Sequence, residues 1–94
     1  MARAIFNDTV IAESDDIELL EGNAYFPLAA LRRDVLHESA HTTRCPWKGT
    51  ARYFTIEVDG EVAPNAAWYY PDPSPAAAAI RDRVAFYPVV RVEP

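Results

Sequence analysis

The sequence predicts a mostly β domain: a compact antiparallel sheet, or a barrel-like or tent-like arrangement, of about seven or eight short strands with one or two short helices. Two observations carry this prediction. Short apolar segments alternate with turn-forming Asn, Asp, Gly and Pro along the chain. In addition, residues 52–58 alternate with period two and run into Asp59-Gly60, a strong hairpin signal. A small α+β domain is the alternative.

In the first half of the chain, strands are expected at 3–6, 9–12, 17–20, 24–27 and 35–38. Asn7-Asp8 separates the first pair and tolerates the positive φ of a tight hairpin turn. Glu21-Gly22-Asn23 ends the third strand. Pro27 favours one helical turn over 28–31, because proline suits the start of a helix.

In the second half, strands are expected at 52–58, 61–68, 84–87 and 89–92, the last two separated by Pro88, with a short helix over 75–83. Pro64 cannot donate a ladder hydrogen bond, which predicts a sheet edge or a bulge. Three prolines make residues 70–75 a rigid loop. Asp72 or Ser74 is expected to cap the helix through a side-chain oxygen.

Size and composition narrow the class of protein. The 94 residues predict a single domain over 1–94, and an apolar half of the chain argues against disorder. A net charge of −5 with scattered cations argues against binding nucleic acid. No apolar run resembles a signal peptide at residues 1–6 or a membrane span elsewhere, so no membrane association is expected. Cys45 is the only cysteine, which fits the reducing cytosol.

The segment from Cys45 to Gly49 is the first candidate site. Pro46 and Gly49 predict a tight turn that holds Cys45 and Lys48 close together. A nearby ammonium favours the thiolate, which makes these two residues candidate catalytic groups. Lys48 is also a candidate cation for a phosphate or carboxylate. The alternative is a small buried thiol in a turn anchored by Trp47, with Lys48 in solvent.

A second aromatic cluster lies at residues 66–73. Alternation places Trp68 and Tyr70 on one side of a strand and Tyr69 on the other, which suits either a ligand pocket or a core. No metal site is expected: His37, His41 and Cys45 are spaced as zinc ligands on a helix, but the residues between and after them oppose a helix. No cofactor-binding motif is present either, so no cofactor is expected.

Three motifs, in order, are Cys45-Pro46-Trp47-Lys48-Gly49, followed by Ala51 and Tyr53; Ala66 to Pro73; and Val84 to Tyr87. Together they resemble the signature of the family known as domain of unknown function 427, from about Arg3 to Tyr87. The resemblance implies a small bacterial or fungal protein of mostly β structure without an established activity. The family also carries a nucleotidyltransferase-like label, but this chain lacks the Gly-Ser and paired-aspartate pattern that such transfer needs.

Hairpin pairing is expected to bring Tyr53 and Trp68 to the end of the sheet that the Cys45–Gly49 turn enters. The leading expectation is therefore a pocket for a small anionic ligand. Its walls would be Trp47, Trp68 and Tyr70, with Lys48 holding the anion and Tyr53 donating a hydrogen bond. The alternatives are an enzyme that uses Cys45 and Lys48, and a non-catalytic module that binds another protein. The sequence does not predict an oligomeric state.

Overall fold

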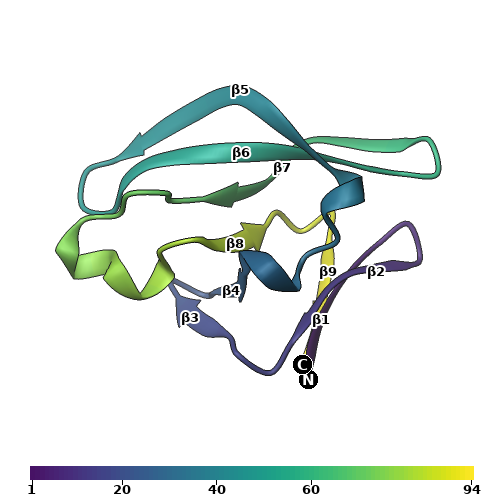
Figure 1. Cartoon of the computed structure of the whole chain (residues 1–94), viewed down its shortest axis with the longest axis horizontal. Coiled ribbons are helices and arrows are strands. Elements are labelled where there is room, and N and C mark those ends of the chain that lie inside the picture. Colours follow the sequence, from purple (N-terminus) through teal and green to yellow (C-terminus); the bar gives the residue numbers. More distant parts are fainter.

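The computed structural model describes every residue from Met1 to Pro94. The strands are β1 (Ala2–Phe6), β2 (Thr9–Ser14), β3 (Glu18–Leu20), β4 (Asn23–Pro27), β5 (Leu36–Cys45), β6 (Gly49–Val58), β7 (Glu61–Tyr69), β8 (Arg83–Phe86) and β9 (Arg91–Glu93). They form a three-stranded sheet, β2-β1-β9, and a six-stranded sheet, β3-β4-β8-β7-β6-β5, with antiparallel pairing throughout (Figure 1). The mostly β prediction is confirmed, and the sheets are open rather than closed into a barrel.

Three short 3-10 helices complete the fold: η1 (Leu28–Ala30), η2 (Arg33–Val35) and η3 (Pro75–Ile80). None has the length and apolar character needed to cross a membrane. The helical turn expected after Pro27 is present as η1. The helix expected over 75–83 is shorter and is kinked at Ala77.

Both predicted hairpin turns are present because their residues accept the left-handed backbone. Asn7 and Asp8 have φ of 49° and 58°, and Asp59 and Gly60 have φ of 49° and 83°. Positive φ at both central positions matches the right-handed twist of the flanking strands. The turn between β3 and β4 is built in the same way, with Glu21 at 53° and Gly22 at 79°.

Strand β5 is the largest departure from the prediction. A short strand was expected at 35–38, but the structure places Val35 in η2 and extends β5 from Leu36 to Cys45. β5 is the edge of the six-stranded sheet, so most of its side chains are exposed and no apolar alternation marks it. The turn before β6 therefore contains only residues 46–48. β5 also arches away from the middle of β6 (Figure 1), where the pairing register shifts between Glu38 and Thr42.

Two smaller predictions also need correction. Ser74 does not cap η3, because its hydroxyl donates to the carbonyl of Trp47 instead, and neither it nor Asp72 makes a side-chain capping bond. The strands expected at 84–87 and 89–92 are β8 and the shorter β9, since a turn around Pro88 takes residues 87–90 out of the ladder.

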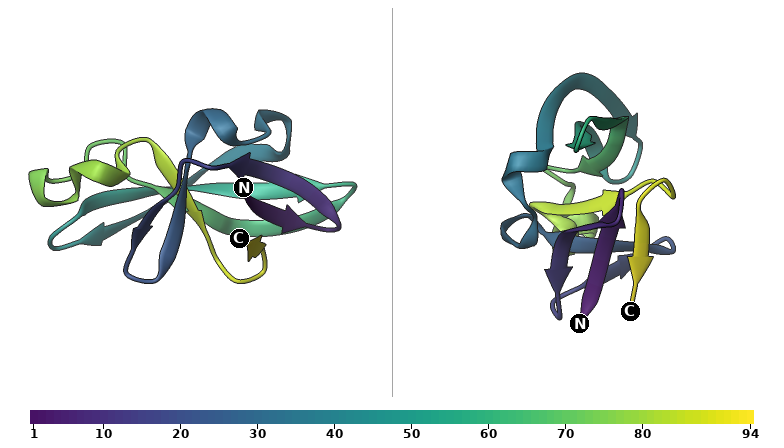
Figure 2. Two further views of the ribbon diagram at one scale, coloured as in Figure 1. Left: turned by 90° about the horizontal axis from the view of Figure 1, so that it is seen from below. Right: turned by 90° about the vertical axis from the view of Figure 1, so that its right-hand side faces the viewer.

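The main core lies on one face of the six-stranded sheet, which we call the inner face, and the three-stranded sheet covers part of it. It contains 16 buried residues, among them Phe6 of β1, Ile11 of β2, and Phe54 and Ile56 of β6. The three-stranded sheet also holds both ends of the chain, because β1 pairs with β9 (Figures 1 and 2). The opposite face of the six-stranded sheet carries the candidate site.

Candidate functional site

The face opposite the inner face is lined by tyrosine and tryptophan, and we call it the aromatic face: Tyr25, Tyr53, Trp68, Tyr70 and Tyr87. Period-two alternation places Tyr25, Tyr53 and Trp68 there, since their strand neighbours Phe26, Phe54 and Ala67 lie in the main core. Tyr70 and Tyr87 directly follow β7 and β8. Three of them, Tyr25, Tyr53 and Tyr70, belong to a second buried cluster that Trp68 packs against. The predicted separation of Trp68 and Tyr70 from Tyr69 is confirmed, because Tyr69 packs on the main core and stacks on Phe54.

Trp68 is at the centre of the aromatic face. It pairs directly across the sheet with Tyr53 on β6 and with Ala85 on β8. The small Ala85 leaves room for Tyr25, whose ring meets the indole edge-on, with centroids 6.3 Å apart and planes at 89°. The indole Nε1 donates to the Tyr25 hydroxyl at 3.1 Å. This hydrogen bond gives the hydroxyl of the fully buried Tyr25 a partner. Burial raises the pKa of the Tyr25 phenol.

Two cavities open beside the aromatic face. The first, of about 560 Å³, is lined by Gly22, Asn23, Ala24, Trp68, Phe86, Tyr87, Pro88, Val90, Arg91 and Val92. The second, of about 510 Å³, is lined by Phe6, His41, Tyr53, Glu61, Val62, Ala63, Pro64, Asn65, Ala66, Tyr87 and Val89. Both volumes fall within the range of small-molecule sites. Tyr87 is the one residue that lines both.

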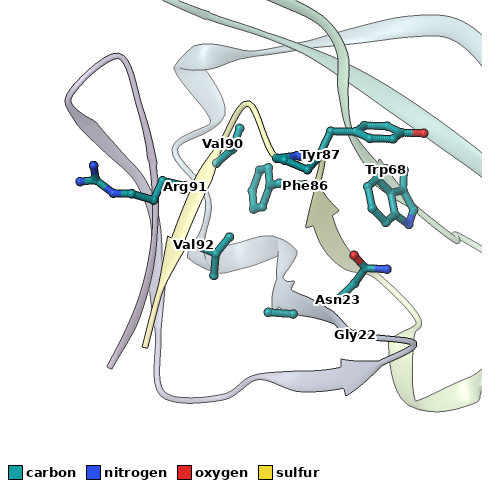
Figure 3. Close-up of a pocket in the computed structure, with 10 residues that line it drawn as sticks. Gly22, Asn23, Trp68, Phe86, Tyr87, Val90, Arg91 and Val92 are labelled. Atoms are coloured by element: carbon teal, nitrogen blue, oxygen red, sulfur yellow. The ribbon is translucent and has the colours of Figure 1, made fainter.

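Tyr87 thus forms the wall between the two cavities. Its ring lies 4.8 Å from that of Trp68, and Figure 3 shows the two side by side at one side of the first cavity. The neighbouring phenol of Tyr53 is the largest of the causes that raise the pKa of Tyr87, and burial adds to it. Tyr87 remains 46% exposed, so solvent can reach its ring. In the same view the side chain of Arg91 points away from the other labelled residues, and it forms an ion pair with Glu93 at 3.2 Å.

Two strand irregularities shape the second cavity. β5 has its register shift at residues 39–41, and β7 has one around Pro64 and Asn65, where φ of Asn65 is 52°. The predicted edge or bulge at Pro64 is therefore a bulge, in a strand that lies inside the sheet. The two bulges are tied together, since Ser39 and Asn65 share a side-chain hydrogen bond of 2.5 Å.

These bulges aim polar groups at Tyr53. The ring of His41 lies 4.6 Å from the ring of Tyr53. The hydroxyls of Tyr53 and Thr43 are 2.9 Å apart and share a hydrogen bond. Bulges are common beside binding sites because they redirect side chains in this way. His41 and the phenols of Tyr53 and Tyr87 thus give the second cavity polar groups, as do Glu61 and Asn65, and Thr43 holds the Tyr53 hydroxyl from outside it.

Lys48 lies near the aromatic face but lines none of the cavities. It is only 8% exposed and forms an ion pair with Glu21 in the β3–β4 turn. Its Nζ is also 5.4 Å from the ring centroid of Trp47 and 5.6 Å from that of Tyr70, both within cation–π range. The ammonium therefore already has an anionic partner and two aromatic ones from its own chain.

The charge pair shifts both pKa values. The hydrogen bond from Lys48 is the largest cause of the lowered pKa of Glu21. Burial alone would lower the pKa of Lys48, but the hydrogen bond to Glu21 and the oxygens of Tyr70 and Tyr25 outweigh it, so that pKa is raised. Each group thus favours the charged form of the other.

Cys45 ends β5 opposite Gly49, and its thiol is half-buried against the second cluster. Neither histidine is placed as a base beside it: His37 lies 3.4 Å from Glu57, and His41 packs on Tyr53. No three His, Cys, Asp or Glu side chains gather in a way that could hold a metal ion.

The structure brings together Cys45, Lys48, Tyr53, Trp68 and Tyr70 on or beside the aromatic face, and Tyr53 pairs with Trp68 as expected from the hairpin. They do not line one common pocket: Trp68 lines the first cavity, Tyr53 lines the second, and the other three line neither. Trp47 lies at the margin of this group and is 41% exposed, with its ring 5.4 Å from Lys48 Nζ.

Sequence reasoning missed several residues of the site: Glu21, Tyr25, His41, Asn65 and Tyr87. Tyr87 had a signal, because it closes the third signature motif, directly before Pro88. No sequence signal marked Glu21, since it is 27 residues from Lys48 and contacts it only in the folded chain.

Comparison with known proteins identifies the family of this chain. No curated protein matches the chain. One family model matches residues 1–93, nearly the whole chain, as the three signature motifs predicted. This protein belongs to the family described as Domain of unknown function (DUF427).

Proposed function

We propose that this domain binds a small molecule with a flat, largely apolar body on the aromatic face, between Trp68, Tyr87 and Tyr53. The observation that carries the proposal is the pair of cavities that meet at the half-exposed ring of Tyr87. Flat rings with single polar tips suit such a ligand, because they bury its faces and bond to its edges.

The surrounding residues support specific roles. Trp68 and Tyr87 offer stacking surfaces for the ligand. Asn23, at the rim of the first cavity, and His41, at the second, offer hydrogen bonds to its edges. The Lys48–Glu21 pair fastens the turn that leads into Gly22 and Asn23, and so holds the rim of the first cavity in place.

A negative charge on the ligand is a separate prediction. It relies on Lys48, which would have to leave Glu21 to reach an anion. Catalysis by Cys45 with Lys48 is likewise a prediction, and the ion pair and the absence of a nearby histidine give it little support. The nucleotidyltransferase-like label of the family identifies no residue that would support an anionic ligand or catalysis.

Binding to another protein through a sheet edge is the third possibility. β5 is a free edge of 10 residues, but its bulge and its charged side chains are features that oppose strand pairing. We place the domain in the reducing cytosol of a bacterium, where the single thiol of Cys45 would stay free. Fractionation of the native host would test this placement.

The binding test uses Trp68 as its reporter. The chain has two tryptophans, so Trp47→Phe leaves Trp68 as the only strong emitter. Flat heterocycles would be titrated in pairs of equal shape and different charge, such as nicotinamide and nicotinate, with fluorescence and melting temperature as readouts. We expect a neutral member to quench Trp68 and raise the melting temperature.

Tyr87→Ala should weaken that binding at least tenfold, which corresponds to about 1.4 kcal/mol. Leu19→Ala is the control, because Leu19 is 75% exposed and lines neither cavity. Quenching that survives Tyr87→Ala would contradict the proposal, as would a set in which no heterocycle binds. A preference for nicotinate that disappears in Lys48→Gln would support the anionic ligand instead.

A further inference from the structure

Most positive side chains of this protein are matched by a carboxylate. The chain has nine Lys and Arg and 14 Asp and Glu. Six of the nine are ion-paired: Arg3, Arg32, Lys48, Arg81, Arg83 and Arg91. The other three are Arg33, Arg44 and Arg52. With carboxylates in excess, guanidinium groups without a partner stand out.

Two of these three arginines share one hollow. Arg44, Thr50 and Arg52 line a cavity of about 440 Å³, together with Gly49, Pro71 and Asp72. It shares no residue with the two cavities of the aromatic face. Alternation along β6 puts Arg52 on the face opposite Tyr53, so this hollow is also on the other side of the sheet.

The strand register fixes the spacing of the two guanidinium groups. Arg44 pairs with Thr50, and Arg52 pairs with Thr42, so Arg44 and Arg52 are diagonal neighbours across the β5–β6 ladder. Diagonal neighbours are about 7–8 Å apart at the backbone, within reach of long side chains. Both guanidinium groups can therefore meet one oxyanion between them, beside the hydroxyl of Thr50.

The opposite wall of the hollow is rigid. The amide of Ser74 donates to the Lys48 carbonyl at 2.9 Å, and the Ser74 hydroxyl donates to the Trp47 carbonyl. This fastens the proline-rich loop to the β5–β6 turn. Gly49, at φ +119°, lies so close that a Cβ there would be 3.3 Å from the carbonyl oxygen of Asp72. The hollow is thus built by the fold before any ligand arrives.

Asp72 is the one acidic side chain of the hollow, and Arg81 neutralises part of its charge. The Arg81 guanidinium lies 3.6 Å from the Asp72 carboxylate and donates to the Pro71 carbonyl at 3.4 Å. The carboxylate is 93% exposed, so water screens the rest of its charge.

We propose that Arg44, Arg52 and Thr50 form a binding site for the phosphate group of a small molecule. Planar guanidinium forks match the oxygens of phosphate in pairs, and two forks cover a tetrahedral anion from two sides. The site does not depend on the proposed function of the aromatic face, because no residue is common to both.

The experiment is a titration of the full-length chain with inorganic phosphate at low ionic strength, followed by NMR of the arginine side-chain N–H groups. We expect the Nε–H signals of Arg44 and Arg52 to shift together along one binding curve. Arg44→Gln and Arg52→Gln should each weaken binding at least tenfold. Asp72→Asn should strengthen it, because it removes the only carboxylate of the hollow.

Arg33→Gln is the matched control, since Arg33 is also unpaired but lines no cavity. It should change the affinity less than threefold. Equal losses in all three arginine variants would overturn the site in favour of a general charge effect, and so would the absence of shifts up to about 50 mM phosphate. Methyl phosphate tells the sources apart: equal binding points to a phosphate ester, and loss of binding points to free phosphate.

Discussion

The two faces of the six-stranded sheet are built from different aromatic residues. All four phenylalanines of the chain lie in the main core on the inner face. Four of its five tyrosines, with Trp68, form the aromatic face. Phenylalanine has no polar atom, so it can be buried on all sides. Tyrosine and tryptophan need a partner for a hydroxyl or an N–H, which Tyr25 and Trp68 supply to each other and Thr43 supplies to Tyr53.

The small residues differ in the same way. On the aromatic face, the small Ala51 and Ala85 lie in the second cluster among the large rings. On the inner face, branched residues such as Ile56 and Val84 fill the space between the phenylalanines. In our proposal the two faces have different tasks: the inner face stabilises the fold, and the rings of the aromatic face bind a small molecule.

The largest expected effect is on the inner face. Phe54→Ala should lower the free energy of unfolding by about 3–5 kcal/mol, because Phe54 is 2% exposed in the core and stacks on Tyr69. Tyr87→Ala on the other face should change it by no more than about 0.5 kcal/mol. Urea unfolding measures both. Similar losses in the free energy of unfolding for the two variants would contradict the idea that the inner face alone stabilises the fold.

A smaller effect is expected at Gly49, the first residue of β6. Gly49→Ala should cost at least about 1 kcal/mol more than Gly60→Ala, although both glycines have positive φ. A Cβ at Gly60 has no neighbour within 4 Å, whereas one at Gly49 would push against the Asp72 carbonyl. Thermal unfolding of the two variants gives the difference. An equal loss of stability in the two variants would mean that the proline-rich loop moves away from the added Cβ at no energetic cost.

The smallest effect is the pH dependence of the Lys48–Glu21 pair. The pKa of Glu21 is lowered, so its contribution is complete above the ordinary value of 4.5 and is lost as the pH falls through the folded-state pKa. The pKa of Lys48 is raised, so its contribution is complete below the ordinary 10.5 and is lost as the pH rises through the folded-state pKa.

The melting temperature of Glu21→Gln should therefore be lower than that of the wild type by a constant amount between about pH 6 and 9, with the gap closing in acid. Glu13→Gln is the control, since its ion pair with Arg3 is exposed on both sides and should contribute little. A gap that persists in acid would show that the charge of Glu21 is not what holds the β3–β4 turn.

Local signals in the sequence predicted much of the fold. The hairpins at Asn7-Asp8 and Asp59-Gly60 follow from residues that accept positive φ, and β6 follows from its alternation. β5 could not be predicted in full, because an edge strand exposed on both sides has no apolar face to mark it. The neighbouring residues predicted a helix cap at Ser74, but the Ser74 hydroxyl donates instead to the carbonyl of Trp47, 27 residues away.

The candidate site was predictable only where it lies within one hairpin. The facing of Tyr53 and Trp68 follows from the β6–β7 turn alone. Tyr25 and Glu21 belong to another hairpin, whose place beside Trp68 and Lys48 depends on β8 pairing with both β4 and β7. Long-range pairing of that kind leaves no pattern in the sequence around either partner.

The pairing of β1 with β9, with Arg3 opposite Glu93, brings the two ends of the chain together (Figures 1 and 2). A host polypeptide would enter and leave this fold at nearly one point, so the domain is suited to insertion into a surface loop without separating the flanking segments. For the same reason, a short linker can join the ends and new termini can be opened at Asp59-Gly60. Such a permutant would move the ends of the chain from the three-stranded sheet to the tip of the β6–β7 hairpin.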